Sequence, residues 1–324
     1  MINFRMDGVL AGIACTVSLL ASTAVAQDVT IRLGGTGAVD SADYLAIEAF
    51  KNSVEERSDG RIAVQIFPNS QLGTYQEMLE QIKAGSLTGM YESLGIIGTW
   101  HPVAGLEAVP YLYRDVDHFF AVWNGQTGAD ILADVAENSG FHVVGPAFRG
   151  FRQMALNEPV ETAEDLVGIK FRAPAIPAYM AAFQALGGSP TPVAFEEVYT
   201  AVQQDIVDGL ENPIVTIADH RFYEVTKYLV MTNHMAETMG FIFSEEWFAE
   251  LPAGLQEDVS QAAIDSAVWY REYTAENEGR TIERLQSEGM TVIEPDLSGF
   301  MEKAAAFDPG LELQEWVRQI RAVQ

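Results

Sequence analysis

Two kinds of apolar spacing alternate along the first part of the chain. Apolar residues occupy every second position in residues 29–33 and 61–67, which is typical of half-buried strands. Each of these segments is followed by one with an apolar face at helical spacing, residues 41–58 and 74–84. Ser41 is suited to begin the first helix. The order strand, helix, strand, helix predicts an α/β unit with a mainly parallel sheet.

A second unit of the same kind begins near residue 150. Residues 169–172 form a predicted strand, and residues 178–186 form a helix whose first turn holds Pro177. A further helix is predicted over residues 196–204. Because no flexible linker separates the two units, we expect the chain to pass between them more than once.

The C-terminal part contains a much longer helical segment, from Pro252 to Glu288, with Gly254 and Gly279 as its main helix breakers. One helical face is marked by Leu255, Val259, Ala262, Ala263, Ser266, Ala267 and Tyr270. An unbroken helix of this length would measure roughly 55 Å, which exceeds the width of one small lobe. We therefore expect it to cross both units and tie them together.

The N-terminal segment has the pattern of a secretory signal peptide. Arg5 precedes an uncharged run from Val9 to Leu20 that is too short to span a bilayer, and residues 24–26 read Ala-Val-Ala. We expect cleavage after Ala26 and a periplasmic mature protein, with an uncleaved amphipathic start as the alternative. Cleavage would remove Cys15, the only cysteine, and with it any disulfide or thiolate site.

The strongly acidic composition limits the choice of partners. The net charge is −27, whereas binding to a nucleic-acid backbone requires a basic surface, so nucleic acid is excluded as a partner. The same charge favours a soluble monomer. An anionic ligand would meet a repulsive field, and its capture would require a local cation.

Common catalytic and cofactor motifs are missing from the sequence. The five histidines do not form a metalloprotease pattern, and there is neither a nucleophile elbow nor a phosphate-binding loop. The pair Gly35 and Gly37 follows the first strand, but Asp40 replaces the third glycine of a dinucleotide fingerprint. We therefore expect no cofactor, no metal ion and no catalysis.

Two arginines stand where an anion could be bound. Arg172 ends a predicted strand just before a helix, the position at which α/β sheets bind ligands. A guanidinium can donate two parallel hydrogen bonds to a carboxylate. Arg152 lies at the start of the second unit. From position alone, a structural ion pair is an equally good interpretation of each arginine.

Six segments in order along the chain resemble the signatures of the solute receptors of tripartite (TRAP) transporters, the DctP family. They are residues 72–77, 150–152, 165–172, 197–204, 207–213 and 222–228. The resemblance implies an α/β periplasmic binding protein fold with two lobes, a hinge and a long helix spanning both lobes. It also implies a small organic acid as ligand and the integral membrane subunits of a TRAP transporter as partners.

The lobes expected from this resemblance are discontinuous in sequence. Lobe 1 would comprise residues 27–149 and about 238–278, and lobe 2 residues 150–237 and about 279–324. Two other functions stay open: a sensory receptor of the same fold, and a carboxylate-processing enzyme.

The resemblance also implies a set of ligand contacts. Arg172 would hold the acid group of the ligand in a two-pronged salt bridge, Arg152 would assist, and the amide of Asn212 would hydrogen-bond the same group. Phe195 would form a wall of the pocket, and His234 would lie in the cleft or its supporting network. The alternatives are a turn residue for Asn212, a core residue for Phe195 and a structural histidine for His234.

Glu92 ends a predicted strand of the first unit and should face the cleft. A carboxylate there would repel an anion unless the ligand also carried donors such as hydroxyl groups. We therefore hypothesise a hydroxylated acid, for example a sugar acid, whose hydroxyls donate to Glu92. The alternative is that Glu92 pairs with an arginine and does not contact the ligand.

Overall fold

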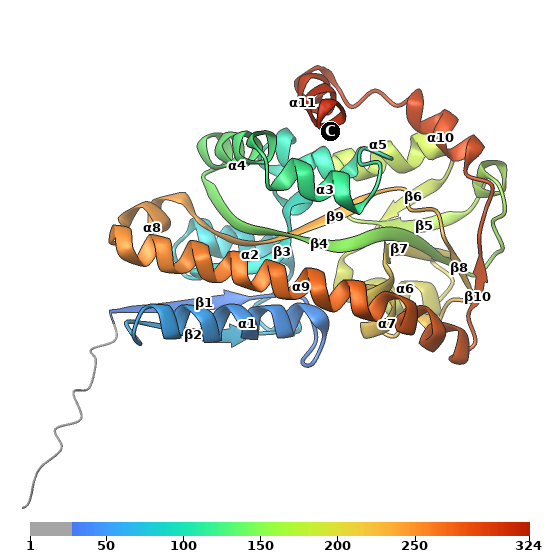
Figure 1. Ribbon diagram of the computed structural model, residues 1–324. Helices are drawn as coiled ribbons and strands as arrows, with labels where there is room; N and C mark the ends of the chain where they lie inside the picture. Colours follow the sequence, from blue (N-terminus) through green and yellow to red (C-terminus); the bar gives the residue numbers. More distant parts are fainter. Residues whose placement is uncertain (1–27) are drawn as a thin grey trace, which may run out of the picture.

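The computed structural model describes residues 28–324 (Figure 1). The predicted signal peptide, residues 1–26, and its cleavage site lie outside this range. Within it, no helix combines the length and the apolar character needed to cross a membrane.

Three parallel strands form the first half of a single mixed sheet. β1 (Val29–Gly34) lies between β2 (Ile62–Phe67) and β3 (Gly89–Ser93) and is parallel to both. As the alternation in β1 predicts, Ile31 and Leu33 point to the same face and are completely buried. Both pack against α1 in one hydrophobic core.

The two predicted helices of this half are confirmed. They are α1 (Ala42–Arg57) and α2 (Tyr75–Lys83). The Ser41 side chain accepts a hydrogen bond from the Tyr44 amide and so caps α1. Thr74 begins α2 in a capping box with Glu77.

Two antiparallel strands extend the sheet and connect its halves. β9 (Ala236–Ser244) pairs with β3, and β4 (Phe141–Leu156) pairs with β9. The far end of β4 pairs instead with β7 (Gly209–Pro213) and β8 (Tyr228–Val230). The sheet is therefore mixed, because these long antiparallel strands lie between its two parallel parts.

The second half of the sheet repeats the parallel arrangement. β5 (Lys170–Ala173) is parallel to β7 and to the edge strand β6 (Ser189–Pro192), while β10 (Thr291–Ile293) pairs with β8. The two prolines of β6 suit an edge position, where the missing N–H donor breaks no ladder. The strand order of the main path is β2-β1-β3-β9-β4-β7-β5-β6.

The helices of the second half also follow the predicted pattern. Pro177 stands in the first turn of α5 (Pro177–Leu186), and Gly187 ends this helix in the left-handed conformation, with φ of 103°. The helix predicted over residues 196–204 consists of a 3-10 turn, η4 (Phe195–Glu197), followed by α6 (Val198–Gln203).

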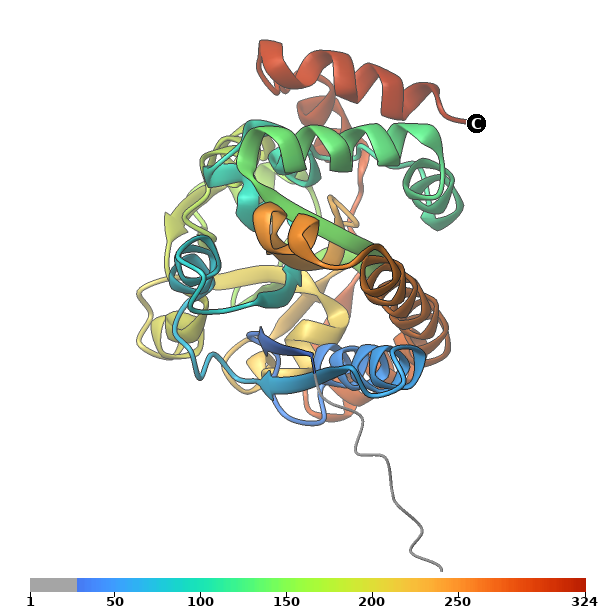
Figure 2. The same ribbon diagram turned by 90° about the vertical axis from the view of Figure 1, so that its left-hand side faces the viewer.

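The remaining helices cover the sheet. They are η1 (Leu94–Thr99), η2 (Pro102–Ala108), α3 (Val116–Trp123), α4 (Gln126–Ser139), η3 (Ala163–Leu166), α7 (Ile214–Asp219), η5 (Phe222–Glu224), α8 (Glu245–Glu250), α10 (Ser298–Ala305) and α11 (Leu311–Ala322). The C-terminal helices form an outer layer: α10 packs on α5, and α11 packs on η2 and α4 (Figures 1 and 2).

The long helix α9 (Ala253–Ser287) spans both halves as predicted and runs diagonally across the molecule in Figure 1. It packs on α1 in the first half, on β4, and on α7 in the second half. The predicted face is buried, except that Ala267 is half-buried. The Ser266 hydroxyl donates a 2.7 Å hydrogen bond to the Ala46 carbonyl, which fixes the helix to α1.

Candidate functional site

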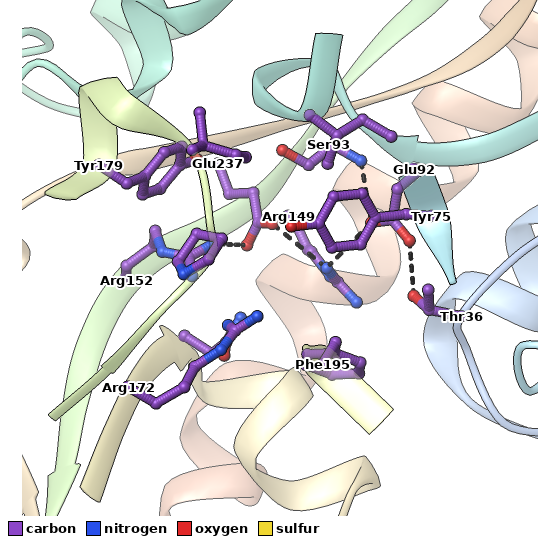
Figure 3. Close-up of a pocket in the computed structure, with 14 residues that line it drawn as sticks. Thr36, Tyr75, Glu92, Ser93, Arg149, Arg152, Arg172, Tyr179, Phe195 and Glu237 are labelled. Carbon is purple, nitrogen blue, oxygen red and sulfur yellow. Dashed lines mark hydrogen bonds and ion pairs between the residues drawn. The ribbon is translucent and has the colours of Figure 1, made fainter. Parts of the chain in front are cut away.

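A pocket lies where the two halves meet (Figure 3). The first half contributes Thr36, Tyr75, Glu92, Ser93 and Ile96 to its lining, and the second half contributes Arg172, Pro174, Ile176, Tyr179, Phe195 and Asn212. The connecting strands β4 and β9 supply Arg149, Arg152 and Glu237. A ligand in this pocket would therefore touch both halves of the molecule.

A bulge in β4 brings two arginines to the same pocket. Positions 149 and 152 are an odd number of residues apart, so a regular strand would direct their side chains to opposite faces. The register with β9 shifts between Phe148 and Gly150, which leaves Arg149 as the extra residue. Gly150 accommodates the distortion with φ of 130°, a conformation that favours glycine.

Arg149 and Arg152 are each neutralised by buried carboxylates. Arg149 pairs with Asp43 and lies 3.3 Å from Glu237 Oε1. Arg152 donates from Nε and Nη2 to Glu211, and its Nη1 lies 2.8 Å from Glu237 Oε2. Burial alone would lower the pKa of both guanidinium groups, but these carboxylates outweigh it and raise both pKa values.

Arg172 differs because no carboxylate neutralises it. Its side chain projects from the end of β5 into the pocket and is only 2% exposed (Figure 3). Nε donates a 2.9 Å hydrogen bond to the Val193 carbonyl, and the guanidinium lies 5.6 Å from the Phe195 ring centroid. Among residues 28–324, none offers it a carboxylate within 4 Å or a hydrogen bond to either Nη atom. Burial lowers the pKa of Arg172 accordingly.

Glu92 forms part of the pocket wall and also lies near an arginine. Its Oε2 accepts a 2.5 Å hydrogen bond from Thr36, its Oε1 accepts one of 3.0 Å from the Ser93 amide, and Arg149 Nη1 is 4.0 Å away. Burial raises the pKa of Glu92, and Arg149 and Thr36 offset part of this rise. The contact with Arg149 is long, so Glu92 retains acceptor capacity toward the pocket.

Asn212 and Phe195 also line the pocket. Asn212 belongs to β7 rather than to a turn. In the amide orientation that satisfies its neighbours, its oxygen accepts from Arg152 Nη2 at 3.1 Å and its nitrogen donates to the Glu211 carbonyl at 2.7 Å. Phe195 is half-buried and packs edge-to-face on His220, with ring centroids 4.7 Å apart.

His234 lies behind the pocket and does not line it. The imidazole has no exposure, its Nδ1 is 2.7 Å from the Thr232 hydroxyl, and its Nε2 is 3.3 Å from Glu211 Oε2. Burial lowers the pKa of His234. Because Glu211 in turn binds Arg152, the histidine belongs to the network that supports this arginine.

Comparison with known proteins identifies the family. The model of the DctP family, described as bacterial extracellular solute-binding protein, family 7, matches residues 33–307. The chain is a member of the DctP family. It is thus an extracytoplasmic solute receptor with the two-lobed fold of TRAP receptors, a family of periplasmic binding proteins that serve transporters.

Individual relatives cover nearly the whole receptor. A solute-binding protein of Roseobacter denitrificans is 34% identical over 96% of this chain and 95% of its own length. A solved Roseobacter denitrificans TRAP receptor with bound L-galactonate has a TM-score of 0.86 at 31% identity, covering 91% of this chain and 99% of that chain.

Two further relatives are associated with other acids, one by its name and one by its bound ligand. The sialic acid-binding periplasmic protein SiaP of Vibrio cholerae is 31% identical over 88% of this chain and 89% of its own length. A solved TRAP receptor of a Polaromonas species, bound to D-erythronate, has a TM-score of 0.87 at 30% identity, covering 91% of this chain and 99% of that chain.

Sequence reasoning missed several buried charges around the receptor's pocket. The sequence analysis did not single out Arg149, Asp43 or Glu237. Arg149 directly precedes residues 150–152, a segment that the sequence analysis did single out. Glu107 was also missed, although it is the only charge in the otherwise apolar run 102–109 and is 4% exposed. An isolated charge in an apolar run is a usable signal, because burying it requires partners.

No metal centre accompanies these charges. Across residues 28–324, no group of three or more histidine, cysteine, aspartate or glutamate side chains is arranged to hold a metal ion.

Proposed function

We propose that the receptor captures a hydroxylated organic acid in the interlobe pocket, binds it without chemical change, and delivers it to the membrane subunits of a TRAP transporter. The observation that carries the proposal is the buried, unneutralised guanidinium of Arg172. An unpaired charge in such a place costs several kcal/mol, and a carboxylate ligand would relieve that cost. The two free Nη groups offer the paired geometry that a carboxylate accepts.

The other pocket residues fit this arrangement. Asn212 and Arg152 lie next to each other in the wall of the second lobe, where they would complete the surroundings of the acid group. Phe195 stacks beside Arg172 and would cover one face of the ligand. Glu92 would accept hydrogen bonds from the ligand's hydroxyls across the cleft, and His234 would act indirectly by orienting Glu211 and Arg152.

Relatives bound to polyhydroxy acids support this substrate class. L-galactonate and D-erythronate, found in two of the similar structures, each combine one carboxylate with several hydroxyls. In this receptor Arg172 would bind the carboxylate of such an acid. Glu92, on the opposite side of the pocket, would accept hydrogen bonds from its hydroxyls.

The rest of the proposal concerns the receptor's organisation and location. We propose cleavage after Ala26, a monomeric mature protein kept apart by its net charge, and lobes formed by residues 27–149 plus about 238–278 and 150–237 plus about 279–324. Binding would shift the population toward a closed form by bridging the lobes.

A thermal-shift screen of refolded, ligand-free protein tests the proposal. The panel contains aldonates, uronates, C4-dicarboxylates, keto acids, aromatic acids and sulfonates. A hydroxylated acid should raise the melting temperature of the native protein. This shift should vanish in Arg172→Ala and persist in the control Arg318→Ala, which alters an exposed arginine. The proposal fails if no acid gives a shift, or if the shift survives in Arg172→Ala.

A further inference from the structure

Three hydroxyl groups line the part of the pocket away from Arg172. They belong to Thr36, Ser93 and Tyr179, and Figure 3 shows them on the upper and right sides of the pocket, with Arg172 at the lower left. Thr36 and Ser93 come from lobe 1, and Tyr179 comes from α5 in lobe 2. A hydroxyl can donate one proton and accept at two lone pairs, so its neighbours decide what it offers to a ligand.

Each of these hydroxyls already gives its proton to a buried carboxylate. Ser93 Oγ lies 2.6 Å from Glu107 Oε1, and the Tyr179 hydroxyl donates to the same oxygen. On the other side of the pocket, Thr36 donates to Glu92 Oε2 at 2.5 Å. A carboxylate is only an acceptor, so the hydroxyl protons point away from the pocket.

Glu107 is held firmly in this arrangement. It belongs to η2, is 4% exposed, and its second oxygen, Oε2, accepts a 3.1 Å hydrogen bond from the Thr238 amide of β9. The Ser93 oxygen also accepts a 3.3 Å hydrogen bond from the Gly95 amide, which uses one of its lone pairs. One lone pair on Ser93 and those on Tyr179 and Thr36 remain for the pocket.

We infer that Glu107 is a specificity-determining residue, which acts through Ser93 and Tyr179 to make the distal wall of the pocket accept hydrogen bonds rather than donate them. Thr36, Glu92 and Glu237 add further acceptors to this wall, and the Nη atoms of the neighbouring Arg149 lie toward Asp43 and Glu237. A ligand must therefore present donors, such as several hydroxyls, at the end remote from its carboxylate.

The inference rests on the proposed function and narrows it. A dicarboxylate would place its second carboxylate against the lone pairs of these hydroxyls and close to the buried carboxylates of Glu92 and Glu237. The receptor should thus select a polyhydroxylated monocarboxylate and reject a dicarboxylate of equal length. Desolvated acceptors facing a second anion are a strong basis for discrimination, because the mismatch leaves buried polar groups unpaired.

Size-matched ligand pairs test this selection by calorimetric titration. D-erythronate is compared with succinate, and L-galactonate with adipate, so that each pair has the same carbon number. The titrations are run at about pH 8.5, because burial raises the pKa of Glu107 to about 7 and the carboxylate form should predominate. The hydroxylated member of at least one pair should bind ten-fold or more tightly than its dicarboxylate.

The variant Glu107→Gln reverses the polarity of the wall. With the amide oxygen kept on the Thr238 N–H, the amide nitrogen takes the place of Oε1 and donates to Ser93 and Tyr179, which releases their protons toward the pocket. The preference for the hydroxylated acid should fall at least ten-fold. A residue that merely stabilised the fold would weaken both members of a pair equally. The control Glu276→Gln alters an exposed glutamate of α9 and should leave the ratio unchanged.

Two further variants keep the test decisive if Glu107→Gln does not fold. Tyr179→Phe and Thr36→Val each remove one acceptor, so each should lower the affinity for the hydroxylated acid and leave that for the dicarboxylate unchanged. If the native receptor binds the two members of each pair with equal affinity, the inference is overturned but the proposed function is not. An unchanged ratio in every folded variant would have the same consequence. Absence of binding by all four acids, or binding that survives Arg172→Ala, would instead contradict the proposed function.

Discussion

Three buried arginines surround one pocket, and their neighbours give them different roles. Arg149 and Arg152 each face carboxylates on other elements, so they hold the strands and α1 together. Arg172 faces only a carbonyl and an aromatic ring. The sequence could not separate these roles, because pairing depends on Asp43 and Glu237, which are distant from the arginines in the chain.

Replacing Arg149 and replacing Arg172 should have different effects on the free energy of unfolding of the ligand-free receptor. Arg149→Met leaves Asp43 buried without its cation and leaves Glu237 with Arg152 alone, so the free energy of unfolding should fall by about 3–5 kcal/mol. Arg172→Met removes an unneutralised buried charge, so the same free energy should be unchanged or higher. Urea unfolding of both variants measures the difference. Equal losses would show that Arg172 is a structural residue.

The buried carboxyl of Glu107 should make stability depend on pH. Burial, and then the charge of Glu237, raises its pKa from 4.5 to about 7 in the folded protein. The folded state therefore binds more protons than the unfolded state between these values, so raising the pH through this window lowers stability. Between pH 4 and 8 the native protein should lose about 3 kcal/mol relative to Glu107→Gln. Parallel pH profiles of unfolding would contradict this assignment.

At the scale of elements, two glycines differ in whether their surroundings leave room for a side chain. Gly145 in β4 has φ of 66°, and a Cβ there would lie 2.4 Å from the Ala263 carbonyl oxygen of α9. Gly279 lies within α9, where a Cβ would meet nothing within 4 Å. Gly145→Ala should thus lower the melting temperature, whereas Gly279→Ala should stabilise the helix by about 1 kcal/mol. Thermal unfolding compares them, and a stabilising Gly145→Ala would show that β4 and α9 are loosely packed.

Elements with a strong local pattern were predictable from sequence. The strands β1 and β2, the helices α1, α2 and α5, and the long helix α9 all follow from apolar spacing and end signals. The length and bulge of β4 were not predictable, because its partners β9, β7 and β8 lie about 50 to 100 residues further along the chain. The placement of Arg149 in the pocket depends on that bulge, so its position was equally inaccessible.

The candidate site was predictable only in part for a related reason. Arg172, Asn212, Phe195 and Glu92 line the pocket and His234 stands behind it, while their contacts with a ligand stay predictions. The carboxylates that pair with the arginines were missed, because a glutamate in a sequence gives little sign of burial.

At the scale of the whole molecule, the net charge of −27 opposes an anionic ligand. The association rate constant for an aldonate should therefore rise when the ionic strength is raised from about 0.01 to 0.15 M, because the Debye length falls from about 30 to 8 Å. Stopped-flow fluorescence can follow binding. A rate that falls with salt would show that the arginines of the pocket dominate the field at its entrance.

The central claim is that Arg172 holds the carboxylate of the ligand, and a crystal structure of the receptor with its tightest-binding hydroxylated acid tests it most directly. The account predicts that the two carboxylate oxygens lie within hydrogen-bond distance of the two Nη atoms of Arg172, with the hydroxyls toward Thr36, Ser93 and Tyr179. A carboxylate bound elsewhere, with Arg172 still lacking an anionic partner, would contradict it.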